Sequence, residues 1–241
     1  MTGMTGTTHE HWYPSVVTGE QRRLRVYTPP GYETDSAPAY PVLYLLHGMG
    51  GDVDAWLREG RANFIMDTLL AEGRARPMLI AMPDGHFFGT DWKERRGTKI
   101  RAFNAELYQS VIPEVERLYR VGRAAKDRAL AGLSMGGGQT ISAGMTRPEM
   151  FRAFGIFSAG LWPEVTPLLE AALPQLRATP PAPLWIGIGR NDPLYGHCVM
   201  LRRMLEVAGI PFTYHEDDTG HTWDAWRDYL ERFAPLLFQS T

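Results

Sequence analysis

Short apolar runs alternate with longer amphipathic segments along most of this chain. The apolar runs, typical of strands buried on both faces of a sheet, cover residues 42–46, 78–82, 128–131, 154–157, 184–188 and 212–215. Segments in which apolar residues recur every three or four positions, as in helices, cover residues 62–72, 105–119, 136–146, 163–177, 196–208 and 223–237. Residues 22–27 alternate polar and apolar side chains, which predicts a half-exposed strand near a sheet edge. Together these segments predict an α/β fold with a central, mostly parallel sheet flanked by helices.

One stretch, residues 85–104, follows no regular period. It carries four aromatic residues: Phe87, Phe88, Trp92 and Phe103. Long irregular loops inside compact domains are usually functional or mobile, so we interpret this stretch as a lid or a substrate-binding loop. The length of 241 residues fits one α/β domain. We therefore expect residues 1–241 to form a single domain that contains this loop.

The overall charge and the apolar content exclude some classes of partner. A formal net charge of −2 argues against a nucleic-acid binder, because such binding depends on a basic face. The basic residues between 93 and 101 are interpreted as a solvated loop, with attraction of an acidic substrate as the alternative. No stretch is long and apolar enough to span a bilayer, so no membrane contact is expected. Residues 1–11 lack an apolar signal-peptide segment, which favours a cytoplasmic location over a secreted mature form. No feature indicates an oligomeric state.

The sequence Gly132-Leu133-Ser134-Met135-Gly136 carries the strongest chemical signal. It fits the pattern G-x-S-x-G directly after a predicted central strand and at the start of a predicted helix. That context is typical of the nucleophile elbow of the α/β-hydrolase fold. We therefore predict that Ser134 is a nucleophile. The backbone amide of Met135, at the helix N-terminus, is predicted to stabilise an oxyanion.

A serine nucleophile needs a general base, and the base needs an orienting carboxylate. In this fold they follow in the order serine, acid, histidine. His221 lies between the last predicted strand and the last predicted helix, where a loop can reach Ser134, and is preferred over His197 and His215. Asp192 follows the predicted strand at residues 184–188 and is the preferred acid. The alternative acids, Asp217 and Asp218, lie close to His221 in sequence, which makes that geometry less direct.

The glycine-rich segment after the first apolar run is the candidate for a second oxyanion donor. In the sequence Leu46-His47-Gly48-Met49-Gly50, glycines let backbone amides approach a substrate. Met49 is the predicted donor, with Gly50 as the alternative. His47 is predicted to brace this loop by hydrogen bonds.

Aromatic side chains near these residues are candidates for the wall of a substrate pocket. An aromatic acyl group requires an apolar slot with a few polar anchors. The candidates are Phe87, Phe88, Trp92, Trp162, Tyr195 and Trp223. Core packing is an equally good interpretation for each of them. Trp223 and Trp226 are also expected to help fix the loop of His221.

Several sequence blocks in one order resemble carbohydrate esterase family 1, which includes feruloyl esterases, acetyl xylan esterases and relatives of enterochelin esterase. The blocks comprise residues 26–32, 45–48, 65–69, 82–85, 111–116, 131–137 and 220–223, followed by Trp226. The resemblance implies a triad of Ser134, Asp192 and His221, no metal or cofactor, and ester hydrolysis through an acyl-enzyme. The feruloyl esterase branch looks most similar, judged by residues 134–140. The implied substrate is a small-molecule or carbohydrate-linked ester.

Other functions on the same scaffold stay open. They are an acetyl xylan or other short-acyl esterase, a siderophore esterase, a thioesterase and an acyltransferase. A thioesterase of the formylglutathione type usually carries a cysteine after the His-Gly of the oxyanion loop, and this chain has none there. A binding protein without catalysis is disfavoured, because such proteins typically lose the serine or the base.

Overall fold

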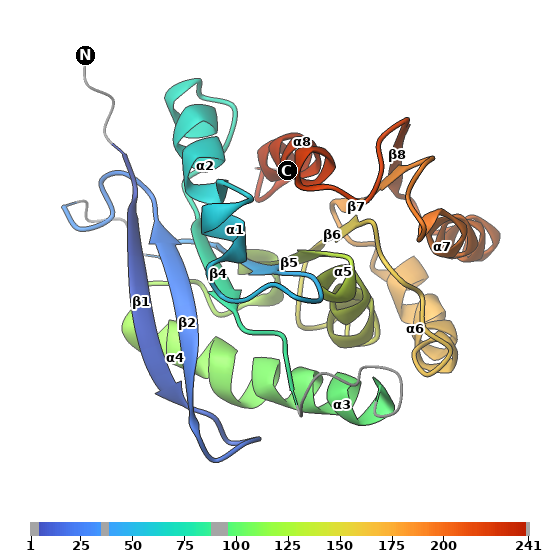
Figure 1. Ribbon diagram of the computed structural model, residues 1–241, viewed down its shortest axis with the longest axis horizontal. Helices are drawn as coiled ribbons and strands as arrows, with labels where there is room; N and C mark the ends of the chain where they lie inside the picture. Colours follow the sequence, from blue (N-terminus) through green and yellow to red (C-terminus); the bar gives the residue numbers. More distant parts are fainter. Residues whose placement is uncertain (1–4, 35–38, 88–95, 240–241) are drawn as a thin grey trace.

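Eight strands in the described part of the chain form one sheet (Figure 1). The computed structural model describes residues 5–34, 39–87 and 96–239. The strand order is β1-β2-β4-β3-β5-β6-β7-β8. β2 pairs antiparallel with β1 and β4, and all other pairings are parallel. The strands are β1 (Thr7–Pro14), β2 (Gln21–Thr28), β3 (Val42–Leu46), β4 (Leu79–Pro83), β5 (Arg128–Leu133), β6 (Ala153–Phe157), β7 (Leu184–Gly189) and β8 (Thr213–Asp217).

Helices cover both faces of this sheet (Figure 1). One face is covered by α1 (Ala55–Arg58), α2 (Ala62–Ala71) and α8 (Trp223–Phe233). The other is covered by α3 (Arg96–Glu106), α4 (Ile112–Leu118), α5 (Met135–Gln139), α6 (Thr166–Ala178) and α7 (Tyr195–Ala208). Successive side chains of a strand point to opposite faces, so Tyr44 packs in one core and Leu43 and Leu45 pack in the other. The buried central strands thus explain the continuous apolar runs of the sequence.

The predicted α/β-hydrolase fold is confirmed, and the structure adds a strand that the prediction omitted. β1 extends the sheet beyond the predicted edge strand β2. Its sequence, TTHEHWYP, is mostly polar, and only Tyr13 in it is fully buried. An edge strand with so little apolar content gives no clear periodic signal.

The prediction of an irregular loop over residues 85–104 is wrong from residue 96 onward, where α3 begins. The expected helix at residues 105–119 therefore begins nine residues earlier and runs through a π-helical segment, Leu107–Val111, into α4. Two polar side chains of α3, Lys99 and Glu106, are buried, which hides the helical period. Glu106 accepts hydrogen bonds from the hydroxyls of Tyr13 and Ser15, at 2.8 and 2.6 Å. Residues 88–95 of the predicted lid lie outside the described residues.

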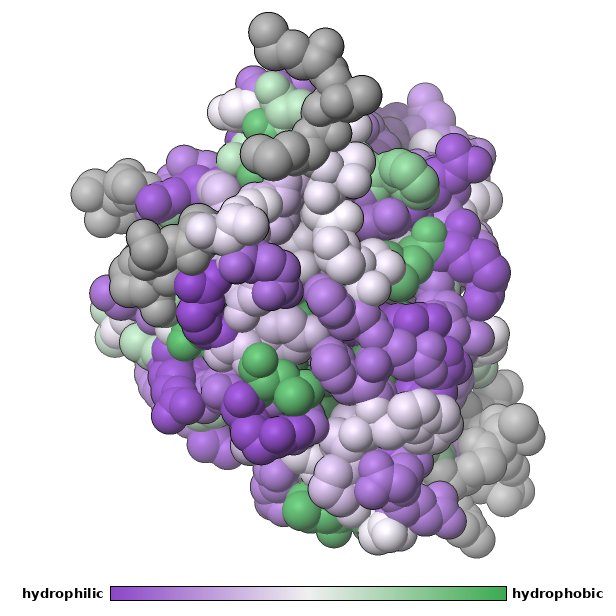
Figure 2. All heavy atoms as spheres, turned by 90° about the vertical axis from the view of Figure 1, so that its left-hand side faces the viewer, coloured by the Kyte–Doolittle hydropathy of each residue, from purple (hydrophilic) through white to green (hydrophobic). Residues whose placement is uncertain are grey.

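The face beside β1 and β2 is mostly hydrophilic, with hydrophobic side chains only in small separate groups (Figure 2). Arg23 and Arg25 of β2 both pair with Glu10 of β1 and with Asp54, the residue before α1. Charged side chains on an edge strand discourage pairing with another chain. Among the described helices, none has the length and apolar character needed to cross a membrane.

Candidate active site

Ser134 lies in the sharp turn between β5 and α5. Its backbone has φ 53° and ψ −115°, a conformation that L-residues rarely adopt. The turn is held by a hydrogen bond from the Ser134 amide to the carbonyl oxygen of Phe157 on β6, at 2.9 Å. A second bond runs from the amide of Gly138 to the Ser134 carbonyl oxygen, at 3.1 Å. The strained residue is therefore anchored to the neighbouring strand and to the helix that follows it.

Two glycines allow this turn to pack against β3. A Cβ atom on Gly132 would lie 2.5 Å from the Gly136 carbonyl carbon, and one on Gly136 would lie 2.5 Å from the His47 carbonyl oxygen. Both distances are far inside van der Waals contact, and both neighbours are backbone atoms that cannot rotate away. Close backbone packing thus explains why the motif needs glycine at both positions.

We expect Gly136→Ala to lower the free energy of unfolding by about 3 kcal/mol, because overpacking forces the backbone to shift. Urea denaturation followed by circular dichroism would measure the change. Gly196→Ala in α7 is the matched control, since a Cβ there meets no atom within 4 Å. The control should change stability by less than about 1 kcal/mol. Equal losses in the two variants would contradict the packing explanation.

The structure brings Ser134, His221 and Asp192 into one hydrogen-bonded series. Nε2 of His221 lies 3.0 Å from the Ser134 hydroxyl oxygen, and Nδ1 lies 2.8 Å from a carboxylate oxygen of Asp192. The amide of Leu194 donates to the other Asp192 oxygen at 2.8 Å. Burial raises the pKa of Asp192, but hydrogen bonds from His221 and Leu194 outweigh it and hold the pKa below its ordinary value. An ionised Asp192 accepts a hydrogen bond from the Nδ1–H group, which leaves Nε2 free of a proton and able to accept the one from serine.

The alternative acids have other partners. Asp217 accepts a hydrogen bond from the Thr219 amide at 2.8 Å, and Asp218 pairs with Arg190 at 2.7 Å. Asp217 also lies 3.2 Å from Nε2 of His215. Among the described hydrogen bonds, the carboxylate that bonds to the His221 ring is therefore that of Asp192, and not that of Asp217 or Asp218.

The loop of Asp192 and the loop of His221 are tied together. The Arg190 amide donates to the Asp217 carbonyl oxygen at 2.8 Å, and the Asn191 amide donates to the Thr219 carbonyl oxygen at 3.1 Å. The Arg190 guanidinium also pairs with Glu216, at 2.8 Å. These bonds continue the pairing of β7 with β8 beyond the ends of the strands.

Ser158 contacts this series and was missed by the sequence analysis. It follows β6 with φ 48°, is fully buried, and its hydroxyl helps to lower the pKa of the Asp192 carboxyl. Its hydroxyl oxygen accepts a bond from Nε1 of Trp226 at 3.1 Å. The Trp226 ring lies edge-on to the His221 ring, with centroids 4.8 Å apart. The contact agrees with the expected role of Trp226 beside His221, and the position of Ser158 at a strand end was the available signal.

The glycine-rich loop after β3 lies directly beside the serine. A Cβ atom on Gly48 would lie 2.6 Å from Cδ1 of Leu133 and 3.2 Å from the Ser134 Cβ, so the absence of a side chain favours this close approach. His47 braces the loop as predicted. Its Nδ1 donates to the Gly48 carbonyl oxygen at 2.8 Å, and its Nε2 accepts from the Gly85 amide at 2.9 Å.

The two predicted oxyanion donors border the serine from different elements. Met135 is the first residue of α5, where amides have no acceptor within the helix. Met49 follows Gly48 and borders the same hollows as Ser134. Both amides are thus placed on elements that meet at the serine, and the helix N-terminus adds a partial positive charge.

Two hollows in the described structure share Ser134 and Met49. The first, called the His221 hollow, has a volume of about 370 Å³ and is also bordered by His221, Trp223 and Arg58. The second, called the Trp162 hollow, has a volume of about 270 Å³ and is also bordered by Trp162, Leu194, His197 and Arg96. A larger hollow of about 1020 Å³ lies at the opposite ends of the strands and includes none of the triad candidates.

The predicted aromatic wall is only partly assembled around these hollows. Trp223 and Trp162 border one hollow each. Phe87 borders neither, because it is buried beneath the Arg22 guanidinium at 4.1 Å, which corrects the prediction. Tyr195 also borders neither, because its hydroxyl is directed to Glu216 at 3.1 Å. The other two candidates, Phe88 and Trp92, lie outside the described residues.

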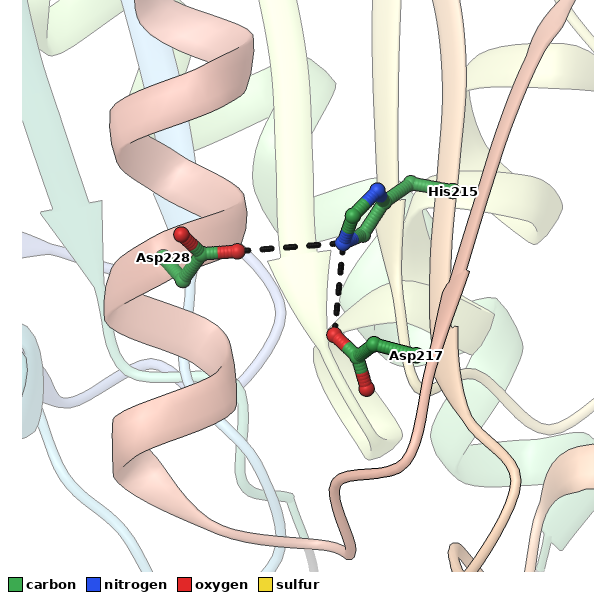
Figure 3. A group of neighbouring side chains, drawn as sticks. All are labelled: His215, Asp217 and Asp228. Atoms are coloured by element: carbon green, nitrogen blue, oxygen red, sulfur yellow. Dashed lines mark hydrogen bonds and ion pairs between the residues drawn. The ribbon is translucent and has the colours of Figure 1, made fainter.

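One cluster of side chains in the described residues has the composition of a metal site. His215, Asp217 and Asp228 point toward one another from β8 and α8, with one potential ligand atom of each within 4.8 Å of the others (Figure 3). The Asp228 oxygen in this group also lies 2.6 Å from Nε of Arg232. The Arg232 guanidinium thus already neutralises part of the negative charge of this cluster. None of its three residues belongs to the hydrogen-bonded series of Ser134, His221 and Asp192.

Comparison with known proteins identifies the family of this chain. The model of the family Esterase, described as "Putative esterase", matches residues 15–236. The chain belongs to this esterase family. It is 31% identical over 229 residues to the endo-1,4-beta-xylanase/feruloyl esterase of Xylanibacter ruminicola, covering 92% of this chain and 30% of the relative. The esterase chain thus spans less than a third of that relative's length.

Solved esterase structures share the fold over almost the whole chain. The CE1 ferulic acid esterase of Anaeromyces mucronatus superposes with a TM-score of 0.85 at 26% identity, covering 97% of this chain and 91% of that one. A structure of that enzyme in complex with ferulic acid is similar to the same degree, with a TM-score of 0.85. The s-formylglutathione hydrolase of Staphylococcus aureus has a TM-score of 0.79 at 18% identity over 99% of both chains, a likeness of fold alone.

Proposed function

We propose that this esterase-family chain is a serine carboxylic-ester hydrolase that cleaves feruloyl, or more broadly hydroxycinnamoyl, esters. The observation that carries the proposal is the unbroken series of hydrogen bonds from Ser134 through His221 to the buried Asp192. A serine oriented in this way beside two backbone amides can form and break acyl bonds.

Each residue has one role in the proposed reaction. The Ser134 oxygen attacks the ester carbonyl carbon while its proton passes to Nε2 of His221. The amides of Met49 and Met135 stabilise the negative charge on the former carbonyl oxygen. The tetrahedral intermediate collapses, the carbon–oxygen bond to the alcohol breaks, and the imidazolium returns the proton to the leaving oxygen. Asp192 stays ionised throughout and stabilises the imidazolium.

The second half of the reaction repeats these steps with water. His221 accepts a proton from a water molecule, whose oxygen attacks the acyl-enzyme at the same carbonyl carbon. The intermediate collapses with release of the carboxylic acid, and Ser134 regains its proton from His221. The products are one acid and one alcohol, and the residues return to their starting protonation states.

The proposed substrate class rests on the similar proteins and on the hollow beside the serine. A relative that is 31% identical is named as a feruloyl esterase, and a solved structure that is 25% identical holds ferulic acid. In this chain the Trp162 hollow offers a largely apolar slot next to Ser134. Such a slot suits an aromatic acyl group.

The proposal predicts selectivity for the acyl group among esters with the same leaving group. We expect kcat/KM for p-nitrophenyl ferulate to exceed those for p-nitrophenyl acetate and octanoate by about tenfold or more, because only the aromatic acyl group fills the slot. Initial rates of nitrophenol release would measure all three. A preference for acetate would move the enzyme to short-acyl esters, and a preference for octanoate would contradict an aromatic pocket.

A further inference from the structure

Only one of the two hollows at Ser134 is bordered by the base, His221. This difference assigns the alcohol part of the ester to one hollow and the acyl part to the other. The imidazolium of His221 must protonate the leaving alcohol, so the alcohol lies on the side of the base. His221 borders the first hollow and does not border the second. The acyl group, on the other side of the carbonyl carbon, therefore occupies the Trp162 hollow. This assignment rests on the function proposed above.

The Trp162 hollow combines apolar walls with two polar side chains. Trp162, Pro163 and Leu194 supply apolar surface, and Arg96 and His197 supply nitrogen atoms. Apolar surface of this kind accepts an aromatic ring without distinguishing its substituents. The two polar side chains are therefore the groups able to select among substituted rings.

The hydrogen bond of His197 fixes which of its nitrogens can accept a bond. Nδ1 lies 3.0 Å from the Leu161 carbonyl oxygen, and a carbonyl oxygen can only accept, so Nδ1 carries the proton. In the neutral ring, Nε2 is then an acceptor. Within the described residues, Nε2 has no hydrogen-bond partner. His197 thus offers the hollow an acceptor for a hydroxyl proton.

Arg96 supplies the complementary donor. Its side chain borders the hollow and remains partly accessible, with 22% of its surface exposed. Its NH1 lies 3.6 Å from Glu164, too far for a strong hydrogen bond. An accessible guanidinium N–H group at this position can therefore donate a hydrogen bond to a ligand oxygen.

We propose that His197 and Arg96 form a recognition site for the phenolic hydroxyl of the acyl group. The hydroxyl donates its proton to Nε2 of His197, and its oxygen accepts a hydrogen bond from Arg96. One donor and one acceptor match a phenol, whereas an aryl ether or an unsubstituted ring leaves His197 unpaired. The enzyme therefore selects hydroxycinnamoyl groups over cinnamoyl groups of the same shape.

A pair of substrates that differ only in this hydroxyl tests the proposal. We expect wild-type kcat/KM for methyl ferulate to exceed that for methyl 3-methoxycinnamate by about tenfold, the typical effect of one hydrogen bond in a desolvated site. In His197→Asn, whose amide can keep the bond to Leu161 while removing the Nε2 acceptor, the ratio should fall to within about twofold of unity. His197→Gln, whose oxygen reaches the position of Nε2, should recover part of the selectivity.

Two further variants separate recognition from folding. Arg96→Met should lower kcat/KM for methyl ferulate more than for the analogue, because the donor to the phenolic oxygen is lost. His9→Asn is the matched control on β1, where His9 contacts Thr28, and should leave the ratio unchanged. In every variant, hydrolysis of p-nitrophenyl acetate reports whether the nucleophile still works.

The outcomes distinguish this proposal from the one on which it rests. If wild type hydrolyses both cinnamoyl esters equally well, or if His197→Asn keeps the wild-type ratio, the recognition site is wrong while the feruloyl esterase function stands. If wild type hydrolyses p-nitrophenyl acetate but neither cinnamoyl ester, the proposed acyl specificity fails, and this inference fails with it.

Discussion

Replacement of Ser134 by alanine is expected to lower kcat for every ester substrate by about 10⁶-fold, because no other group in the site can form the acyl-enzyme. The loss should appear in kcat with little change in substrate binding. The fold should survive, since alanine adds no atom to the tight turn and the backbone bonds of Ser134 are retained. Steady-state kinetics and thermal unfolding of the same preparation would measure both effects.

Covalent labelling gives an independent test of the same assignment. A fluorophosphonate probe should label the wild-type protein once and should not label Ser134→Ala. Ser142→Ala is the matched control, because Ser142 is also buried but its hydroxyl bonds to Asn104 at 3.1 Å and not to a histidine. Labelling of the Ser134 variant at the wild-type rate would show that another residue is the nucleophile.

Replacement of Asp192 by asparagine is expected to lower kcat by about 10⁴-fold, with a smaller effect on KM. Asparagine keeps the size of the side chain but removes the charge that stabilises imidazolium, and its amide can donate to Nδ1 and so reverse the tautomer of His221. The Nε2 atom would then carry a proton and could not accept one from Ser134. Measurement of kcat and KM across pH would separate this effect from a loss of binding.

Asp218→Asn is the control for that experiment. Asp218 is an acid in the same loop as His221, but it pairs with Arg190 on the surface. We expect its kcat to stay within about twofold of wild type, since exposed ion pairs contribute little. A near-normal kcat in Asp192→Asn, or a large loss in Asp218→Asn, would reverse the assignment of the acid.

The sequence predicted the central strands well because they are buried on both faces. Such strands must be apolar along their whole length, and strands β3 to β7 are also bounded by turns and helices that break the run. The ends of the sheet were harder to predict. β1 carries mostly exposed polar side chains, and α3 buries Lys99 and Glu106, so neither shows the expected periodicity.

The residues of the candidate site also differ in how far the sequence could predict them. Some are marked by the local sequence, and others depend on contacts between distant parts of the chain. Ser134 is marked by a short motif whose glycines are required by local packing, and His221 and Asp192 follow strands whose ends meet in the sheet. The positions of Ser158 and Phe87 depend on contacts across the fold, and the place of Ser158 at a strand end is the one signal that the sequence offers for them. Ser158 gains its role only because Trp226 and Asp192 meet there, and Phe87 is buried beneath an arginine from β2.

The ties between the loop of Asp192 and the loop of His221 have a consequence for motion within the site. The two loops are joined by backbone hydrogen bonds, whereas Ser134 is anchored separately to β6. We therefore expect the acid and the base to move together when these loops shift, so that the 2.8 Å bond between Asp192 and His221 is kept. The 3.0 Å distance from His221 to the serine oxygen joins two separately anchored groups, and we expect it to be the distance that such shifts change.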